Sequence, residues 1–205
     1  MKYKSLLLAF AVLTCLIAGG LNATASDIGS KAPEFSLKDV QGNTHNLADY
    51  KGKYVVLEWI NFDCPFVVKH YSSKNMQNLQ KHYADKGVIW LAVCSSAPGK
   101  QGHYPNNEVI SKMKELGMNV KAYLVDEDGK VGKQYDARTT PHMYVINPDG
   151  ILIYQGGIDD KKSTNANDIA NSKNYVQAAL DEAFAGNKVS QPSAQPYGCS
   201  VKYKD

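Results

Sequence analysis

A strongly apolar segment that passes straight into a helical pattern places the tightest limit on how this chain folds. Residues 53–60 are rich in β-branched and aromatic side chains and are bounded by Gly52 and Asn61, which predicts a buried strand. Residues 65–85 then repeat apolar side chains at helical spacing, which predicts a helix. Cys64 lies where the strand gives way to the helix.

The same alternation continues along the chain. Strands are expected at 88–94, 121–125, 142–146 and 151–155, and helices at 108–116, 130–135 and 175–185. The turn-forming residues 147–150 join the last two strands as an antiparallel hairpin. Strands that alternate with helices and end in a hairpin predict an α/β fold with a central mixed sheet flanked by helices.

The first 25 residues have the features of a secretory signal peptide. Lys2 and Lys4 precede an apolar stretch at 6–21, and Ala23-Thr24-Ala25 is a small-residue cleavage site. We expect cleavage after Ala25 and export to the periplasm or out of the cell. An uncleaved anchor and a lipoprotein modified at Cys15 are the weaker alternatives.

The remaining length suits one domain, expected at 26–186, followed by a polar tail at 187–205. The full chain has 23 basic and 20 acidic residues, a formal charge of +3. This balance does not suggest nucleic-acid binding, and we expect no stable membrane insertion after cleavage. The oligomeric state stays open at this stage.

Three cysteines remain after signal cleavage: Cys64, Cys94 and Cys199. An odd number cannot all pair within one chain. Cys64 at a helix start would lie near unpaired backbone N–H groups and the positive end of the helix dipole, which stabilise a thiolate. Pro65 suits the first helical turn. A reactive thiol at Cys64 is therefore favoured over a buried, inert one.

Several short motifs follow one another in a characteristic order along the chain. They are Pro33-x-Phe35-x-Leu37-x-Asp39, Gly52-Lys53, Trp59 before Cys64-Pro65, Leu124-Val125-Asp126-x-Asp128-Gly129, Thr139-Thr140-Pro141, Tyr144-Val145-Ile146, Asp149-Gly150, Gly156 and Gly198-Cys199-Ser200-Val201-Lys202. Together they resemble the alkyl hydroperoxide reductase/thiol-specific antioxidant (AhpC/TSA) family of the thioredoxin/peroxiredoxin superfamily, in particular its peroxiredoxin-like redoxin group. The resemblance covers residues 27 to about 185 and extends to the tail motif.

The resemblance implies a thioredoxin-like fold with an N-terminal extension and a C-terminal tail. It also implies that Thr140-Pro141 is a cis-proline pair facing Cys64, in a loop that pairs with the substrate backbone. The candidate substrate-binding residues are Pro65, Phe66, Thr140, Pro141 and His142.

Glu58 lies six residues before Cys64, where thioredoxins carry a buried acid. A buried carboxyl group there would have a raised pKa and could pass a proton to or from the thiol through water. A solvent-facing position on an edge strand is the equal alternative for Glu58.

The sequence also departs from both parent patterns. Val67 stands where a thioredoxin has its second cysteine and where a peroxiredoxin has its peroxide-reactive one, and Arg138 lies three residues before the proline rather than beside it. A partner for Cys64 must therefore come from elsewhere. Cys199 is the first candidate and Cys94 the second; a static Cys94–Cys199 disulfide is the alternative.

The favoured function is an exported thiol-based oxidoreductase with an antioxidant or redox-balancing role. It would use Cys64 as the nucleophile, Cys199 as the resolving thiol and Glu58 as the proton carrier. A protein disulfide or a peroxide would be the substrate, an external thiol the reductant, and no cofactor or metal is expected. The alternatives are a copper-binding chaperone using Cys64, His142 and Cys199, and a non-catalytic binding domain.

Overall fold

The computed structural model describes residues 27–204. The expected signal peptide, its cleavage site and Cys15 lie outside these residues and stay predictions. No helix among the described residues is long and apolar enough to cross a membrane.

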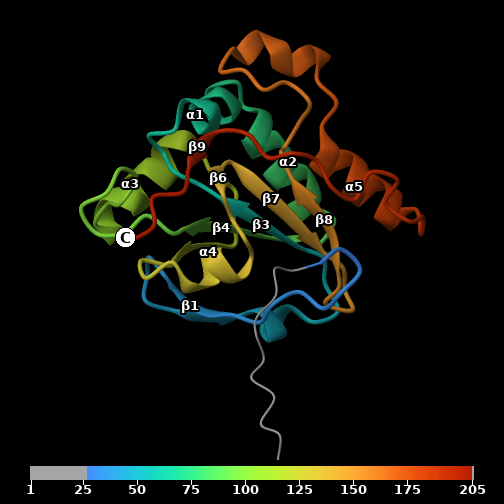
Figure 1. The fold of residues 1–205 in the computed structure, drawn as a ribbon, viewed down its shortest axis with the longest axis horizontal. Helices are drawn as coiled ribbons and strands as arrows, with labels where there is room; N and C mark the ends of the chain where they lie inside the picture. Colours follow the sequence, from blue (N-terminus) through green and yellow to red (C-terminus); the bar gives the residue numbers. More distant parts are fainter. Residues whose placement is uncertain (1–26, 205) are drawn as a thin grey trace, which may run out of the picture.

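A seven-stranded mixed sheet runs through the molecule in the order β2-β1-β5-β4-β3-β7-β8 (Figure 1). Strands β3, β4 and β5 are parallel, whereas β7 runs antiparallel to β3 and forms a hairpin with β8. The strands are β1 Ser36–Asp39, β2 Thr44–Asn46, β3 Val55–Trp59, β4 Ile89–Cys94, β5 Ala122–Val125, β7 His142–Ile146 and β8 Leu152–Gly156. The predicted mixed sheet and terminal hairpin are confirmed.

Helices cover both faces of this sheet. The α-helices are α1 Pro65–Ser72, α2 Asn75–Ala84, α3 Asn106–Leu116, α4 Lys130–Gln134 and α5 Tyr175–Phe184, and the 3-10 helices are η1 Leu47–Tyr50 and η2 Ala166–Asn171. Alternate residues of β3 face two different cores. Val56 joins a first core with side chains of α1, α2 and α5, and Val55 joins a second core with side chains of η1 and α4.

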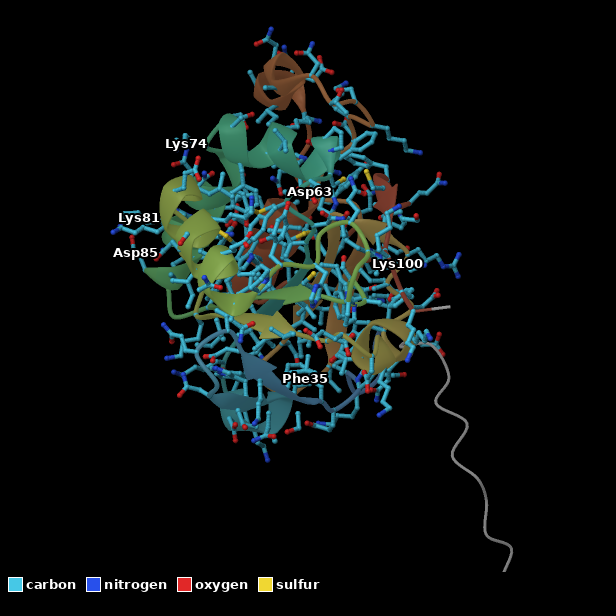
Figure 2. The ribbon with its side chains drawn as sticks, turned by 90° about the vertical axis from the view of Figure 1, so that its left-hand side faces the viewer. Phe35, Asp63, Lys74, Lys81, Asp85 and Lys100 are labelled. Atoms are coloured by element: carbon cyan, nitrogen blue, oxygen red, sulfur yellow. The ribbon has the colours of Figure 1, made fainter. Side chains whose placement is uncertain are left out.

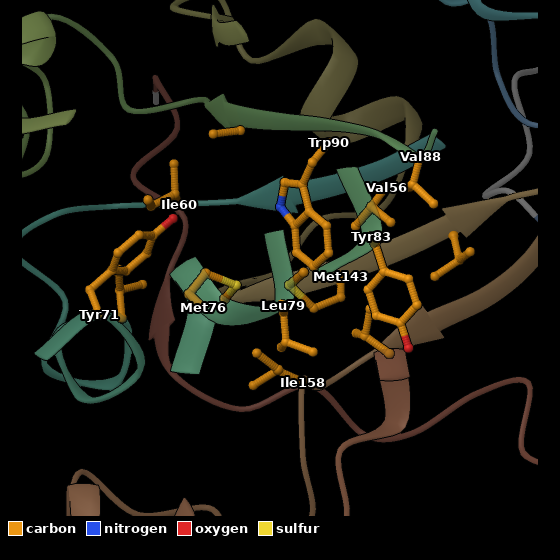
Figure 3. Packing of buried hydrophobic residues seen from close by; sticks show 14 of the residues in the cluster. Val56, Ile60, Tyr71, Met76, Leu79, Tyr83, Val88, Trp90, Met143 and Ile158 are labelled. Atoms are coloured by element: carbon orange, nitrogen blue, oxygen red, sulfur yellow. The ribbon is translucent and has the colours of Figure 1, made fainter. Parts of the chain in front are cut away.

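The first core lies behind the strand-to-helix junction. Figure 3 shows Trp90 from β4 packed among Met76, Leu79 and Tyr83 of α2, with Met143 of β7 beside them. The exposed fraction of each of these side chains is 7% or less. The junction at Cys64 is therefore built on a close-packed support.

The single helix predicted at 65–85 is in fact two helices. Ser73 Oγ donates to the carbonyl oxygen of Lys69 at 2.8 Å, and Lys74 takes a left-handed conformation with φ 62°. A serine that bonds the preceding turn competes with helix continuation, so α1 ends at Ser72 and the chain turns before α2. The other predicted strands and helices lie within two residues of their expected bounds.

The tail is docked along the domain. Ala194 N donates to Gln155 O at 3.2 Å, beside the end of β8. Further on, β9 Cys199–Ser200 pairs antiparallel with β6 Thr139–Thr140 in a separate two-stranded sheet. In Figure 1 the red chain accordingly runs back from α5 across to the side of α1 and α3. The polar pattern at 187–198 did not predict this docking.

Candidate functional site

Cys64 is the N-cap residue of α1, as the sequence predicts, and Pro65 occupies the first turn. Figure 2 labels Asp63, the residue immediately before this helix start. The Cys64 side chain is 0% exposed, and its Sγ donates to the carbonyl oxygen of Thr140 at 3.0 Å. The thiol therefore lies beneath the Thr140-Pro141 loop.

The Thr140–Pro141 peptide bond is cis, which confirms the conformation that the resemblance implied. Thr140 is buried and belongs to β6, where it lies directly opposite Cys199 of β9. Its buried hydroxyl has no nitrogen or oxygen partner among the described residues, and it faces the Cys64 sulfur, whose pKa it lowers. The loop thus brings Cys64 and Cys199 to one place.

Cys64 and Cys199 lie close enough together for each thiol to shift the pKa of the other. Burial alone would raise the pKa of Cys64, but hydrogen bonds from the Cys199 thiol, from Thr140 and from the backbone amides of Cys199 and Val67 outweigh it and lower the pKa. Burial and the neighbouring Cys64 raise the pKa of Cys199 to about 11. Cys64 is therefore the thiol of this pair that ionises first.

Cys94 is not part of this pair. It is a free, buried thiol at the end of β4, and its Sγ donates to the carbonyl oxygen of Gly102 at 3.6 Å. The sulfur of Cys199 has Cys64 as its neighbour instead. A static Cys94–Cys199 bridge is absent from this structure, in which all three described cysteines are free thiols.

Gly198, just before Cys199, allows the tail to approach the loop. Its φ is 139°, and a Cβ atom at this position would lie 2.0 Å from the backbone oxygen of Thr140. Any side chain would therefore push β9 off β6. The sequence analysis included Gly198 only as part of a motif. A glycine directly before Cys199 could have indicated that the tail backbone lies close to another backbone at this point.

A buried polar cluster that sequence reasoning missed holds the tail two residues before Cys199. We name it the Tyr197 clasp; it consists of Tyr197, Asp159, Lys69 and His70. The Tyr197 hydroxyl donates to Asp159 Oδ1 and lies 3.3 Å from His70 Nε2. Lys69 Nζ is 3.5 Å from Asp159 Oδ2. All four side chains are at least 93% buried.

The clasp ties the tail to the helix that begins at Cys64. Lys69 and His70 belong to α1, and the Phe66 ring on the same helix meets the Tyr197 ring edge-on at 5.8 Å. Burial lowers the pKa of His70 to about 4, more strongly than the nearby Asp159 raises it. At neutral pH the imidazole is therefore uncharged, and Lys69 supplies the positive charge facing Asp159.

Glu58 is fully buried in β3, so the solvent-facing alternative is excluded. Tyr71 Oη donates to Oε1 at 2.8 Å, and Trp90 Nε1 and Gln80 Nε2 donate to Oε2 at 2.8 and 3.1 Å. Burial outweighs these hydrogen bonds and raises the pKa of Glu58 to about 7. Its carboxylate contacts these three side chains rather than the sulfur of Cys64.

His142 lies on the other side of the sheet. Its ring packs against Tyr144 at 4.6 Å between centroids, and Tyr144 belongs to the second core whereas Cys64 belongs to the first. The amide of Arg138 donates to His142 Nδ1 at 3.3 Å. Burial lowers the pKa of His142 to about 4. The structure thus brings together Cys64, Thr140, Pro141, Phe66 and Cys199, and leaves His142 apart.

Two further observations bear on the metal-binding and peroxide alternatives. Within residues 27–204 there is no group of three or more His, Cys, Asp or Glu side chains arranged to hold a metal ion. The guanidinium of Arg138 forms an exposed ion pair with Asp136 at 2.6 Å. That arginine is therefore engaged away from the buried sulfur.

The chain is similar to known proteins. The model of the AhpC/TSA family matches residues 28–155, which is more than half of the chain. The chain belongs to the AhpC/TSA family. Among the curated relatives of this AhpC/TSA protein is the thiol-disulfide oxidoreductase ResA of Bacillus subtilis, which is 33% identical over 125 residues. That match spans 61% of this chain and 64% of ResA, just under two thirds of its length.

Solved structures place the AhpC/TSA protein among thioredoxin-like folds. An uncharacterized conserved protein from Geobacillus kaustophilus is 32% identical, with a TM-score of 0.74 over 87% of this chain and 93% of its own. The thioredoxin domain of a thiol-disulfide oxidoreductase from Bacteroides vulgatus is 20% identical, with a TM-score of 0.51 over 72% of this chain and 98% of its own. The second likeness concerns the fold alone.

Proposed function

We propose that this protein is a thiol–disulfide oxidoreductase whose redox pair is Cys64 and Cys199. The observation that carries the proposal is the position of Cys199 directly opposite Thr140, whose carbonyl oxygen accepts a 3.0 Å hydrogen bond from Cys64 Sγ beside the cis Thr140–Pro141 bond. The lowered pKa of Cys64 supports its role as the nucleophile. Similarity to a relative named as a thiol-disulfide oxidoreductase supports the same chemistry.

In the proposed reaction, the Cys64 thiolate attacks one sulfur of a substrate disulfide, and the other substrate sulfur leaves as a thiolate. Cys199 then loses its proton and attacks the Cys64 sulfur of the mixed disulfide. The second substrate sulfur leaves, so the substrate is reduced by two electrons and Cys64–Cys199 becomes a disulfide. An external thiol reductant restores the two free thiols.

The surrounding residues have supporting roles in this proposal. The Thr140 hydroxyl and the first-turn amides stabilise the Cys64 thiolate, and Pro141, Pro65 and Phe66 border the place where a substrate arrives. Glu58 acts as a buried proton reservoir, which its pKa of about 7 suits. Because its carboxylate does not contact the sulfur, its proton would travel through water.

Disulfide exchange is favoured over peroxide reduction by two features. Val67 occupies the position of the peroxide-reactive cysteine, and Arg138 pairs with Asp136 rather than facing Cys64. Peroxide chemistry would therefore lack its usual electrostatic support here.

The proposal includes export and a division of the chain. Residues 1–25 would be the signal peptide, 26–186 the redox domain, and 187–205 a tail that completes the active site. The periplasm or the exterior would be the compartment, where a disulfide can persist. A protein disulfide would be the substrate and an external thiol the reductant.

Peptide mass spectrometry and an insulin-reduction assay test this proposal. We expect the oxidised protein to contain a Cys64–Cys199 linkage, and Cys64→Ser to abolish insulin reduction. The matched control is Cys94→Ser, which removes a buried thiol outside the pair and should retain the activity. Peroxide consumption should stay near that of an ordinary thiol. Unchanged insulin reduction in Cys64→Ser would refute the proposal.

A further inference from the structure

A polar cavity lies apart from the two cysteines, beside the end of β8. Its volume is about 330 Å³, and its walls come from three segments: residues 136–142, Gln155 and Gly156 of β8, and residues 193–196 of the tail. Neither Cys64 nor Cys199 lines it. This volume is at the small end of the range for ligand sites, so the cavity suits a small molecule.

The wall between β8 and the tail is held by backbone contacts. Gln155 N donates to Pro192 O at 3.1 Å, and Ala194 N donates to Gln155 O at 3.2 Å. Gly156 allows this approach, because a Cβ atom there would lie 2.0 Å from the backbone oxygen of Ala194. The cavity is therefore bounded by packed backbone on this side.

His142 offers the cavity one N–H donor. Arg138 N donates to His142 Nδ1 at 3.3 Å, and burial lowers the pKa of His142 to about 4. At neutral pH the ring therefore carries a single hydrogen, which lies on Nε2 because Nδ1 accepts. Within residues 27–204, Nε2 has no hydrogen-bond partner. The ring is only 5% exposed and lines the cavity, so this donor is held in place.

An ion pair lies beside this donor. Arg138 Nε donates to Asp136 Oδ1 and Oδ2 at 3.1 and 2.9 Å, and Nη2 donates to Oδ2 at 2.6 Å. Both side chains line the cavity. A ligand with only a carboxylate would compete with Asp136 for the guanidinium. A ligand that also carries an ammonium supplies an opposite charge to each member of the pair.

We propose that this cavity binds an α-amino acid group, in which an ammonium and a carboxylate share one carbon atom. The carboxylate accepts from the Arg138 guanidinium and from His142 Nε2, and the ammonium donates to the Asp136 carboxylate. Gln155 and Ser193 border the rest of the ligand. Free amino acids carry this group, and so does the γ-glutamyl end of glutathione. The inference is independent of the proposed redox reaction, because neither cysteine takes part.

An NMR titration tests this proposal. L-Alanine and S-methylglutathione, which carries the group but has no free thiol, are added separately to the ¹⁵N-labelled protein. Long-range ¹H–¹⁵N spectra report the ring nitrogens of His142, assigned by their loss in His142→Gln. We expect a saturable shift of Nε2. Saturation by L-alanine supports a free amino acid as the ligand, and saturation by S-methylglutathione alone supports a larger carrier of the group. No saturable shift with either compound would overturn the inference.

The controls separate the two charges of the ligand. Propionate and ethylamine each lack one of them and should not saturate at concentrations at which the zwitterion does. Saturation by propionate at the same concentrations would contradict the role of Asp136. Arg138→Gln should weaken binding about tenfold or more, as expected for a lost hydrogen bond to a charged group.

Lys121→Gln is the matched control for Arg138→Gln. It also removes an exposed positive charge, but Lys121 does not line the cavity, so the affinity should stay unchanged. Equal weakening in both variants would contradict the site. Insulin reduction does not enter these measurements, so a negative result here is distinct from failure of the proposed function.

Discussion

At the scale of single residues, the chemistry depends on whether a buried side chain is protonated or ionised. Neighbouring hydrogen-bonding groups and burial decide between the two forms. Cys64 is buried like an inert cysteine, yet hydrogen bonds from Cys199, Thr140 and two backbone amides favour its thiolate. Glu58 shows the opposite balance, because burial outweighs three hydrogen bonds and favours its neutral form. One fold thus lowers one pKa and raises another.

Thr140→Val should raise the pKa of Cys64, because valine keeps the shape of threonine but removes the hydroxyl that faces the sulfur. Thiol exchange below that pKa should slow several-fold. The measurement is ultraviolet absorbance of the thiolate against pH. Thr139→Val is the control, because the Thr139 hydroxyl donates to Pro141 O instead. Equal titration curves for wild type and Thr140→Val would contradict the assigned role of this hydroxyl.

Glu58→Gln should change how stability depends on pH. In the folded protein Glu58 keeps its proton up to about pH 7, whereas its ordinary pKa is 4.5. Between these values the folded state binds more protons than the unfolded state, so wild-type stability falls as pH rises. The loss is on the order of 3 kcal/mol.

Urea unfolding at several pH values checks this expectation. Glutamine can accept from Trp90 and Gln80 and donate to the Tyr71 hydroxyl, so the variant keeps the network. Its unfolding free energy should lack the decline between about pH 5 and pH 7 that the wild type shows. Parallel curves for the two proteins would contradict the raised pKa.

At the scale of elements, the site depends on a pairing of two very short strands. Strands β6 and β9 place Thr140 opposite Cys199, and Gly198 permits their close approach. Neither strand has a sequence pattern of its own, because two residues are too few for an alternation to be seen. The two strands pair because the tail docks against the domain.

Gly198→Ala should lift β9 from β6, because the added Cβ would lie 2.0 Å from the Thr140 oxygen. Cys64 should then react with a polymer-linked maleimide at least tenfold faster than in the wild type. Gly186→Ala is the matched control: it also has a positive φ, 76°, but nothing lies within 4 Å of the added atom. An equal increase in both variants would show that backbone strain alone, rather than the overlap, exposes Cys64.

At the scale of the whole molecule, three distant parts of the chain meet in the Tyr197 clasp: α1, the loop after β8, and the tail. Their joint burial sets the position of Cys199 over Cys64. Held in this way, Cys199 has a high effective concentration at its partner. The stability of the proposed Cys64–Cys199 disulfide would therefore depend on contacts far from either sulfur.

Tyr197→Phe should weaken that disulfide, because it removes a hydroxyl that donates to the buried Asp159 and keeps the ring against Phe66. A tenfold fall in effective concentration corresponds to a reduction potential less negative by about 30 mV. Equilibration in glutathione buffers measures it. Tyr54→Phe removes a hydroxyl bonded to Ala183 O instead and should leave the potential unchanged. Equal potentials for wild type and Tyr197→Phe would argue against the clasp.

The sequence predicted what local patterns encode. The periodicity of apolar residues located the strands and helices. Cys64 could be placed between a strand and a helix because the residues before it and after it have different periodicities. The resemblance supplied the cis bond at Pro141. The break between α1 and α2 was not predicted. Ser73 and the left-handed Lys74 interrupt the helix, but the apolar residues keep helical spacing across the break.

The Tyr197 clasp was missed for a different reason. Asp159 and Lys69 are ordinary surface residue types, and only their burial against Tyr197 makes them a unit. The pattern of polar and apolar residues within one segment does not indicate which distant residue a side chain will contact. The face of His142 was likewise fixed by strand register, which its position next to Pro141 did not reveal.

The position of β9 in the chain bears on how the protein is made. It follows every other described element, so Cys199 leaves the ribosome long after Cys64. During that interval the domain can form its core while Cys64 still lacks its tail partner. The proposed redox pair therefore assembles only after the other described elements have been synthesised. Before the tail docks, Cys64 lacks both its cover and the hydrogen bonds from Cys199 that lower its pKa.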